Sequence, residues 1–233
     1  MRLDRFISNA SDYSRSQVKQ LLRAGLVEVN GLITTNAATQ VAEGDTISVD
    51  GFDISTPSPR YLMLHKPAGV VSVTKDSEHP TALDLLDEPR PEQLQIAGRL
   101  DIDTTGLLLI TDDGQWNHRI TSPRSHCRKT YRVELAEPLN TALVKKFADG
   151  LWLEGEKRRC LPAELEITGE HSALLTISEG KYHQVKRMFA AVGNRVTGLH
   201  RQKVGQIELD PRLAPGEYRP LTPDEIDSVN THE

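Results

Sequence analysis

The sequence predicts an α+β fold with a small N-terminal domain and a larger second domain built around a mostly antiparallel mixed sheet. Strand-like and helix-like segments follow one another without the regular alternation of a doubly wound parallel sheet. Segment 52–60, FDISTPSPR, has two prolines and no hydrophobic periodicity, which is typical of a semi-rigid linker. The 233 residues are enough for two unequal domains. We therefore expect domains at 1–56 and 61–233, with a linker at 57–60.

The N-terminal domain should contain a helix that begins after Ser14. Ser14 and Gln17 have the spacing of a capping box, and Gly25 is a natural stop. Apolar residues recur between them at helical spacing: Val18, Leu21 and Leu22. Three basic residues recur at every fourth position and are called the basic stripe below: Arg15, Lys19 and Arg23. Alone, such a stripe is an ordinary solvated helix face.

A tight hairpin is predicted directly after this helix. Segment 27–33, VEVNGLI, alternates around Asn30-Gly31, a pair typical of the type I′ turn because both central residues need positive φ. A further strand is expected at 46–49. Next to this hairpin, the basic stripe favours contact with RNA phosphates, which give affinity and orientation but little base specificity.

Short elements of both kinds are expected along the larger domain. Its predicted strands are the apolar or alternating segments 61–64, 70–73, 107–110, 131–135 and 174–177. Its predicted helices are 81–86, 139–147 and 183–192. The run at 107–110, LLLI, is continuously apolar, so this strand should be buried on both faces.

Composition indicates a protein of the reducing cytoplasm. No apolar run approaches the roughly 18 residues of a membrane span, and the N-terminus has no apolar signal-peptide core. Cys127 and Cys160 match no metal or redox spacing, so we expect two free thiols.

The basic residues include two concentrated groups, although the net charge is −5. Neither segment 114–133 nor segment 180–207 contains an acidic residue. Their basic residues are Arg119, Arg124, Arg128, Lys129, Arg132, Lys181, Lys186, Arg187, Arg195, Arg201 and Lys203. A polyanion responds to local potential rather than to net charge, so this distribution favours a nucleic-acid partner. The alternative is that both segments contribute to scattered solvated surfaces.

A charged turn meets the buried strand in segment 97–111, AGRLDIDTTGLLLIT. Arg99, Asp101 and Asp103 lie within five residues and are followed by Thr-Thr-Gly, a turn composition. Side chains at the edge of a rigid element are commonly used to build sites. The density of charge favours chemistry over a structural turn.

Several segments resemble the RNA pseudouridine synthases. The resemblance begins with GRLD at 98–101 and TGLL at 105–108. It continues in chain order through YLMLHKP at 61–67, TDDG at 111–114, KTY at 129–131 and EGKYHQVKRMF at 179–189. The closest match is the branch that modifies small-subunit ribosomal RNA. The N-terminal helix and hairpin resemble the S4-like RNA-binding domain. The resemblance of the remainder to the synthases implies a catalytic domain with a central cleft.

This resemblance implies isomerisation of one uridine of 16S ribosomal RNA, position 516, through a flipped-out base. The reaction breaks the bond from ribose C1′ to base N1 and remakes it to C5, so neither a cofactor nor a metal is expected. Asp101 matches the catalytic carboxylate, Lys186 its basic partner, and Tyr131 the aromatic residue that stacks on the displaced base. Arg99 should hold phosphate or fill the space that the base leaves.

Further substrate contacts are expected from the basic segments. They are assigned to Arg15, Lys19, Arg23, Arg128, Lys129, Lys181 and Arg187. The expected partner is ribosomal RNA in a small-subunit assembly intermediate, bound by a monomer that has no contact with a membrane.

Structural alternatives remain for several of these residues. Lys186 could be a surface lysine of an amphipathic helix, and Tyr131 could fill the core. A turn role is favoured for Asp103 and for segment 112–114, and a hydrogen-bonding role at a helix start for His183.

Three rival functions also fit parts of the sequence. The first is a nuclease in which Asp101 and Asp103 hold magnesium. The second is a non-catalytic RNA-binding protein. The third is a synthase that acts on 23S ribosomal RNA.

Overall fold

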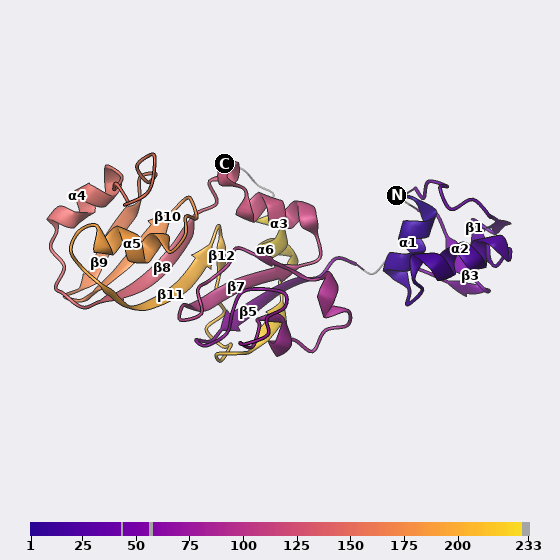
Figure 1. Cartoon of the computed structure of the whole chain (residues 1–233), viewed down its shortest axis with the longest axis horizontal. Coiled ribbons are helices and arrows are strands. Elements are labelled where there is room, and N and C mark those ends of the chain that lie inside the picture. The colour runs from indigo at the N-terminus through magenta and orange to yellow at the C-terminus, as the bar shows by residue number, and fades with distance from the viewer. Residues whose placement is uncertain (43, 56–57, 230–233) are drawn as a thin grey trace. The chain divides into compact units, whose positions relative to one another are not determined.

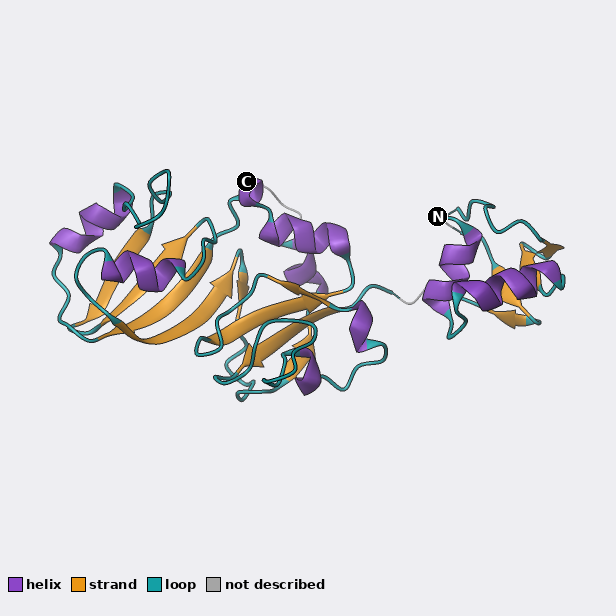
Figure 2. Ribbon diagram, in the orientation of Figure 1, coloured by secondary structure: helices purple, strands orange, loops and turns teal. Residues whose placement is uncertain are grey.

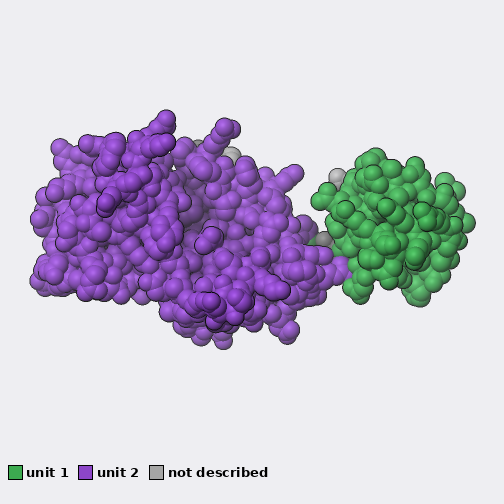
Figure 3. Space-filling model, viewed as in Figure 1, with its two compact units in different colours: residues 1–58 green, residues 59–233 purple. Residues whose placement is uncertain are grey.

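The protein is described by a computed structural model that covers residues 1–42, 44–55 and 58–229 (Figure 1). The chain divides into two compact units, Met1–Ser58 and Pro59–Glu233 (Figure 3). Residues 56 and 57 of the predicted linker lie outside the described residues. The stretch 52–60 was predicted too broadly as a linker, because Phe52–Asp53 forms strand β4 and pairs with strand β3, Ile47–Val49.

Unit 1 packs two helices on a small antiparallel sheet. The helices are α1 (Leu3–Ala10) and α2 (Arg15–Arg23), and the strand order is β2-β1-β3-β4 with β1 Val27–Val29 and β2 Leu32–Ile33. The predicted capping box of α2 is confirmed, since Ser14 Oγ accepts from the Gln17 amide and Gln17 Oε1 accepts from the Ser14 amide. Helix α1 was not predicted.

The predicted hairpin of unit 1 is confirmed. Asn30 and Gly31 have φ values of 52° and 75°, as a type I′ turn requires. The Asn30 side chain also donates to Asp45 and accepts from the Thr46 amide, which ties the turn to strand β3. The buried residues of both helices and the sheet form one core, which includes Leu3, Ile7, Val18, Leu22, Val27 and Ile47.

Unit 2 is built on a nine-stranded sheet with the path β13-β5-β7-β11-β8-β10-β9. Its strands are β5 (Tyr61–Lys66), β6 (Gln95–Ala97), β7 (Thr105–Thr111), β8 (Lys129–Leu135), β9 (Glu164–Gly169), β10 (Ser172–Ile177), β11 (Val196–Val204), β12 (Ile207–Glu208) and β13 (Tyr218–Pro220). Outside this path, β6 pairs with β7 and β12 pairs with β11. Only the short β7–β11 pairing is parallel among the described pairs, so the predicted mixed, mostly antiparallel sheet is confirmed.

Both faces of this sheet are covered. The helices are α3 (Gly114–Thr121), α4 (Ala142–Ala148), α5 (Gln184–Ala190) and α6 (Pro223–Asp227), with one-turn 3-10 helices at Leu83–Leu85, Pro91–Gln93 and Pro123–Ser125. Figure 2 shows α4 and α5 over the half of the sheet that contains β8 to β11. Leu108 and Ile110 of β7 enter one core while Leu107 and Leu109 enter the other. The prediction that this strand is buried on both faces is therefore confirmed.

Several predicted boundaries in unit 2 are wrong. Segment 70–73 is not a strand, because Val71 forms only an isolated bridge to Thr81 while the chain turns back after Gly69. The helix predicted at 81–86 is a single 3-10 turn, and that predicted at 139–147 begins only at Ala142. Segment 112–114 is not an isolated turn, since the Asp113 carboxylate caps helix α3.

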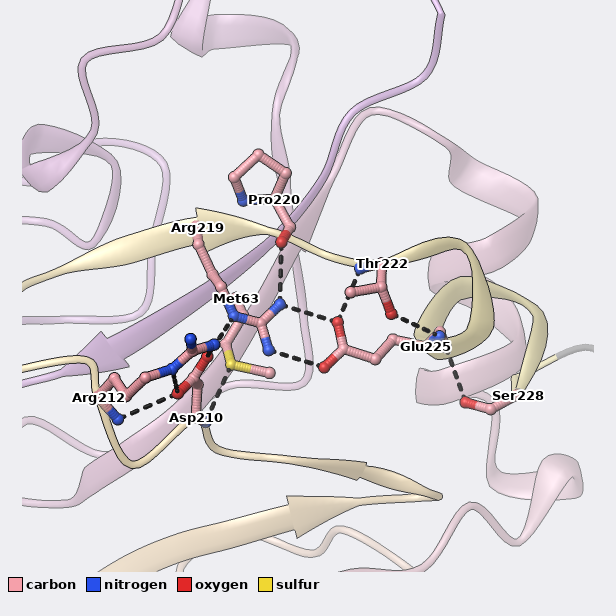
Figure 4. A network of polar contacts seen from close by, with 8 residues as sticks. All are labelled: Met63, Asp210, Arg212, Arg219, Pro220, Thr222, Glu225 and Ser228. Atoms are coloured by element: carbon pink, nitrogen blue, oxygen red, sulfur yellow. Dashed lines mark hydrogen bonds and ion pairs between the residues drawn. The ribbon is translucent and has the colours of Figure 1, made fainter.

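The C-terminal segment is fastened across β5 by a polar network (Figure 4). Asp210 accepts hydrogen bonds from Arg212 and Arg219, which hold the pKa of its carboxyl well below the ordinary range. Arg219 also makes two hydrogen bonds to Glu225 of α6. The Asp210 amide donates to the Met63 sulfur of β5. This network supports the strand that lies beside β7, and β7 begins at the charged turn described next.

Candidate active site

The charged turn, residues 98–104, joins the antiparallel neighbours β6 and β7. It starts at Gly98, whose φ of 91° favours glycine, and the Thr104 amide closes it by donating to the Asp101 carbonyl at 3.1 Å. The Asp101 side chain is 31% exposed, so its carboxylate is partly shielded yet open to a substrate.

Lys66 of β5 holds the C-terminal end of this turn. Its ammonium is fully buried and donates to the backbone carbonyls of Thr104 at 2.7 Å, Pro67 at 2.9 Å and Ile102 at 3.4 Å. Burial lowers the pKa of Lys66 to about 8, although the nearby Asp103 and Asp101 charges oppose that change. Sequence reasoning did not assign this residue; its only signal was its place in YLMLHKP.

Arg201 fastens the near end of the turn. Its guanidinium is 1% exposed and donates to the carbonyls of Gly98 and Leu107, each at 2.8 Å, and to that of Arg99 at 3.5 Å. A Cβ at Gly106 would collide with the backbone of Arg201, which explains the glycine in TGLL as the point where β7 and β11 pair. Arg201 was predicted to lie in a nucleic-acid-binding segment, but its guanidinium binds backbone carbonyls inside the fold.

Ser72 provides one more support for the turn. Its Oγ accepts a hydrogen bond from the Leu100 amide at 3.1 Å within the protein interior. Thus β5, the following loop and β11 together fix the backbone on both sides of Asp101. A rigidly held carboxylate is what a catalytic role requires.

Lys186 of helix α5 supplies the cation beside this carboxylate. Its Nζ lies 3.1 Å from Asp101 Oδ2 and 2.6 Å from Asp103 Oδ1. Burial alone would lower the pKa of Lys186, but the hydrogen bonds to Asp103 and Asp101 raise it above its ordinary value. The same hydrogen bond lowers the pKa of Asp103. Lys186 is therefore charged at neutral pH, and Asp103, which lies in the turn as expected, also binds Lys186.

His183 lies near the other carboxylate oxygen of Asp101. Its Nε2 lies 3.5 Å from Asp101 Oδ1, and its backbone has the left-handed φ of 46°. His183 lies at the start of α5, as expected, but its side chain makes no cap hydrogen bond to that helix. The imidazole instead lies beside the Asp101 carboxylate.

Tyr131 and Arg99 differ in their exposure, since Tyr131 is buried and Arg99 is exposed. Tyr131 is 7% exposed on β8, opposite Arg201 of β11, and belongs to the larger core. Arg99 is exposed, two residues before Asp101. The structure thus places Tyr131 on the strand next to the one that fastens the turn, and leaves Arg99 accessible to a ligand.

The other predicted RNA contacts divide into two groups. The basic stripe of α2 is fully on the surface of unit 1. The remaining four residues have partners within unit 2: Arg128 pairs with Glu164, Lys129 donates to the carbonyls of Cys127 and Ile120, and Lys181 and Arg187 both bind Glu156. Burial also lowers the pKa of Lys129. The stripe is therefore the more accessible of the two groups.

Comparison with known proteins agrees with this geometry. The sequence model of the RNA pseudouridylate synthases matches residues 60–191, which include the charged turn, Tyr131 and Lys186. The chain belongs to this family. The model of the S4 domain matches residues 1–47. Family membership makes the chain a pseudouridine synthase.

Relatives match this synthase over nearly their whole length. Ribosomal small subunit pseudouridine synthase A of Escherichia coli (strain K12) is 53% identical, covering 98% of this chain and all of that protein. The protein of the same name from Vibrio parahaemolyticus is 52% identical, covering 98% and 99%. A crystal structure of a pseudouridylate synthase aligns with a TM-score of 0.72 and 47% identity, covering 98% and 99% of the two chains.

The magnesium-nuclease alternative has little support from the site. The cation between Asp101 and Asp103 is the Lys186 ammonium. Among residues 1–42, 44–55 and 58–229, no three His, Cys, Asp or Glu side chains are grouped as metal ligands. The same described residues contain no helix long and apolar enough to cross a membrane.

Proposed function

We propose that this synthase isomerises one uridine of small-subunit ribosomal RNA, position 516 of 16S, to pseudouridine with Asp101 as its catalytic carboxylate. The observation that carries the proposal is the 3.1 Å contact between Lys186 Nζ and Asp101 Oδ2 on a turn fastened by Lys66 and Arg201. The choice of RNA rests on the relatives that are named for the ribosomal small subunit.

The chemistry needs a carboxylate at the sugar. The bond from C1′ to N1 breaks, the freed uracil turns, C5 bonds to C1′, and the proton on C5 is lost while one is gained at N1. Asp101 serves either by adding to C1′ or by removing the 2′ proton, and both routes require its ionised form. The Lys186 ammonium stabilises that form in a site which a bound nucleotide closes to water.

The remaining residues position the substrate. The uridine must leave its stack to reach Asp101, and stacking on Tyr131 offsets part of the free energy of unstacking. Exposed Arg99 contacts phosphate or occupies the space left by the base. The basic stripe of unit 1 adds affinity through phosphate contacts.

Mapping of carbodiimide-induced reverse-transcription stops tests this function. Ribosomal RNA from cells with and without the gene should differ at one 16S position, and the purified protein should restore that stop. A difference confined to 23S RNA would identify a large-subunit synthase, and no difference would leave only RNA binding. Naked 16S RNA and assembly intermediates, tested side by side, decide the physical form of the substrate.

Asp101→Asn tests the catalytic assignment, with Asp103→Asn as the matched control. Both changes remove one carboxylate that binds Lys186, yet only the first should abolish product while RNA affinity stays near wild type. Turnover by purified Asp101→Asn protein would refute the assignment.

A further inference from the structure

Tyr182 is an exposed aromatic residue beside the candidate active site. It exposes 76% of its surface, and its ring stacks on His183 with centroids 3.7 Å apart and an interplanar angle of 22°. His183 Nε2 is in turn 3.5 Å from Asp101 Oδ1. The two rings therefore form a short stack that starts at the catalytic carboxylate and ends with one open aromatic face.

The backbone under this stack is firmly held. The Lys181 amide donates to Gln184 Oε1 at 2.8 Å, and Gln184 Nε2 donates to Glu179 Oε1 at 2.8 Å. Arg187 Nη1 donates to the Tyr182 carbonyl at 3.0 Å. Because the turn is already ordered, a ligand that stacks on Tyr182 loses little free energy to ordering the protein.

The surroundings of the stack suit a nucleic acid. Lys181 and Arg187 flank the turn and share one carboxylate, that of Glu156, so this pair of side chains keeps one positive charge in excess. Lys186, on the helix that follows His183, is paired with Asp101 and Asp103. An aromatic face bordered by cations is the arrangement used to bind single-stranded nucleic acid, where bases stack and phosphates meet positive charge. The Tyr182 ring contacts His183 on one face and is not part of a hydrophobic core. A role in stabilising the core therefore does not account for this aromatic side chain.

We propose that the open face of Tyr182 binds an unpaired base next to the target uridine, so that Tyr182 and His183 form a stacking platform at the entrance of the site. The proposal rests on the proposed function in one respect, that the target ribose lies at Asp101. Every base has a stacking face, so the platform should contribute affinity and register rather than sequence selection. Tyr182 is a positioning residue that does not touch the reacting atoms.

Fluorescence of 2-aminopurine tests the platform directly. The probe is placed on either side of the target uridine in a short single-stranded RNA and is bound by protein carrying Asp101→Asn, which prevents turnover. Stacking should quench the probe on one side. Quenching should persist with Tyr182→Phe, which keeps the ring, and disappear with Tyr182→Leu, which has a side chain of similar bulk but no ring.

Steady-state kinetics on the catalytically active protein give a second readout. Tyr182→Leu should raise KM about tenfold with a smaller change in kcat, and Tyr182→Phe should restore the wild-type KM. Trp152→Leu is the matched control, since Trp152 is another exposed aromatic residue of unit 2, at 58%. It should leave the quenching beside the target unchanged.

The outcomes separate this inference from the proposed function. Unchanged quenching and KM in Tyr182→Leu, in a protein that Asp101→Asn inactivates, would overturn the platform alone. Persistent turnover in Asp101→Asn would refute the catalytic assignment, while loss of quenching in Tyr182→Leu would still establish the stack. Failure of the wild-type protein to bind the RNA would end both.

Discussion

Lys66→Met should remove a large pH dependence of stability. In the folded protein burial lowers the pKa of Lys66 to about 8, whereas an unfolded lysine keeps its proton to about 10.5. Between these two pH values the unfolded chain binds one more proton than the folded chain, so the free energy of unfolding rises with pH. The difference between 10.5 and 8, at about 1.4 kcal/mol per pH unit, gives a rise of about 3 kcal/mol.

Tryptophan fluorescence during urea unfolding measures this rise. Both tryptophans, Trp116 and Trp152, belong to unit 2, so the signal follows the unit that contains Lys66. The unfolding free energy of the wild type should increase between pH 8 and 10.5 by about 3 kcal/mol more than that of Lys66→Met. Lys75→Met, which replaces an exposed lysine, is the control and should follow the wild type.

Parallel pH profiles for the wild type and Lys66→Met would refute this reasoning. They would mean that burial does not lower the pKa of Lys66 in the folded protein. The same variant should also lose activity, because the carbonyls of Pro67 and Thr104 lose their donor and the turn that carries Asp101 relaxes. A loss of about 2 kcal/mol of transition-state stabilisation corresponds to a roughly 30-fold lower kcat.

The other predictions concern catalysis, folding and binding. Lys186→Met should lower kcat by about 100-fold because Asp101 loses a charge-assisted hydrogen bond of roughly 2 to 3 kcal/mol, and single-turnover kinetics that match the wild type would exclude Lys186 from the site. Gly106→Ala should destabilise unit 2 by at least about 3 kcal/mol, since its Cβ meets the backbone of Arg201 and its φ is 107°; a chemical unfolding midpoint equal to the wild type would contradict the close approach. Replacing the basic stripe by alanine should weaken RNA binding and flatten its dependence on salt, with little change in kcat at saturating RNA, and an unchanged salt slope in filter binding would rule out phosphate contacts there.

The sequence allowed prediction wherever the signal was local. The capping box at Ser14 and the Asn30-Gly31 turn depend on neighbouring residues, and both were predicted correctly. The apolar run at 107–110 identified the strand buried on both faces. The false strand at 70–73 had suitable composition but found no strand to pair with, which only the tertiary fold decides.

The candidate site was predictable only in part for the same reason. The family resemblance singled out Asp101 and Lys186, which the structure brings within 3.1 Å. Lys66 and Arg201 carry no local sign that their charges are buried under backbone carbonyls. Lysine and arginine side chains in basic or strand-like segments ordinarily face solvent. Their hydrogen bonds to buried backbone carbonyls could therefore be recognised only in the assembled sheet.

The fastening of the Asp101 turn has a consequence for protein synthesis. Arg201 follows the turn in the chain and belongs to β11, whereas unit 1 precedes both. During synthesis the turn that carries Asp101 can therefore be fixed at Gly98 only after β11 has left the ribosome. A chain that ends before Arg201 would contain Asp101 but would lack the guanidinium that holds its turn.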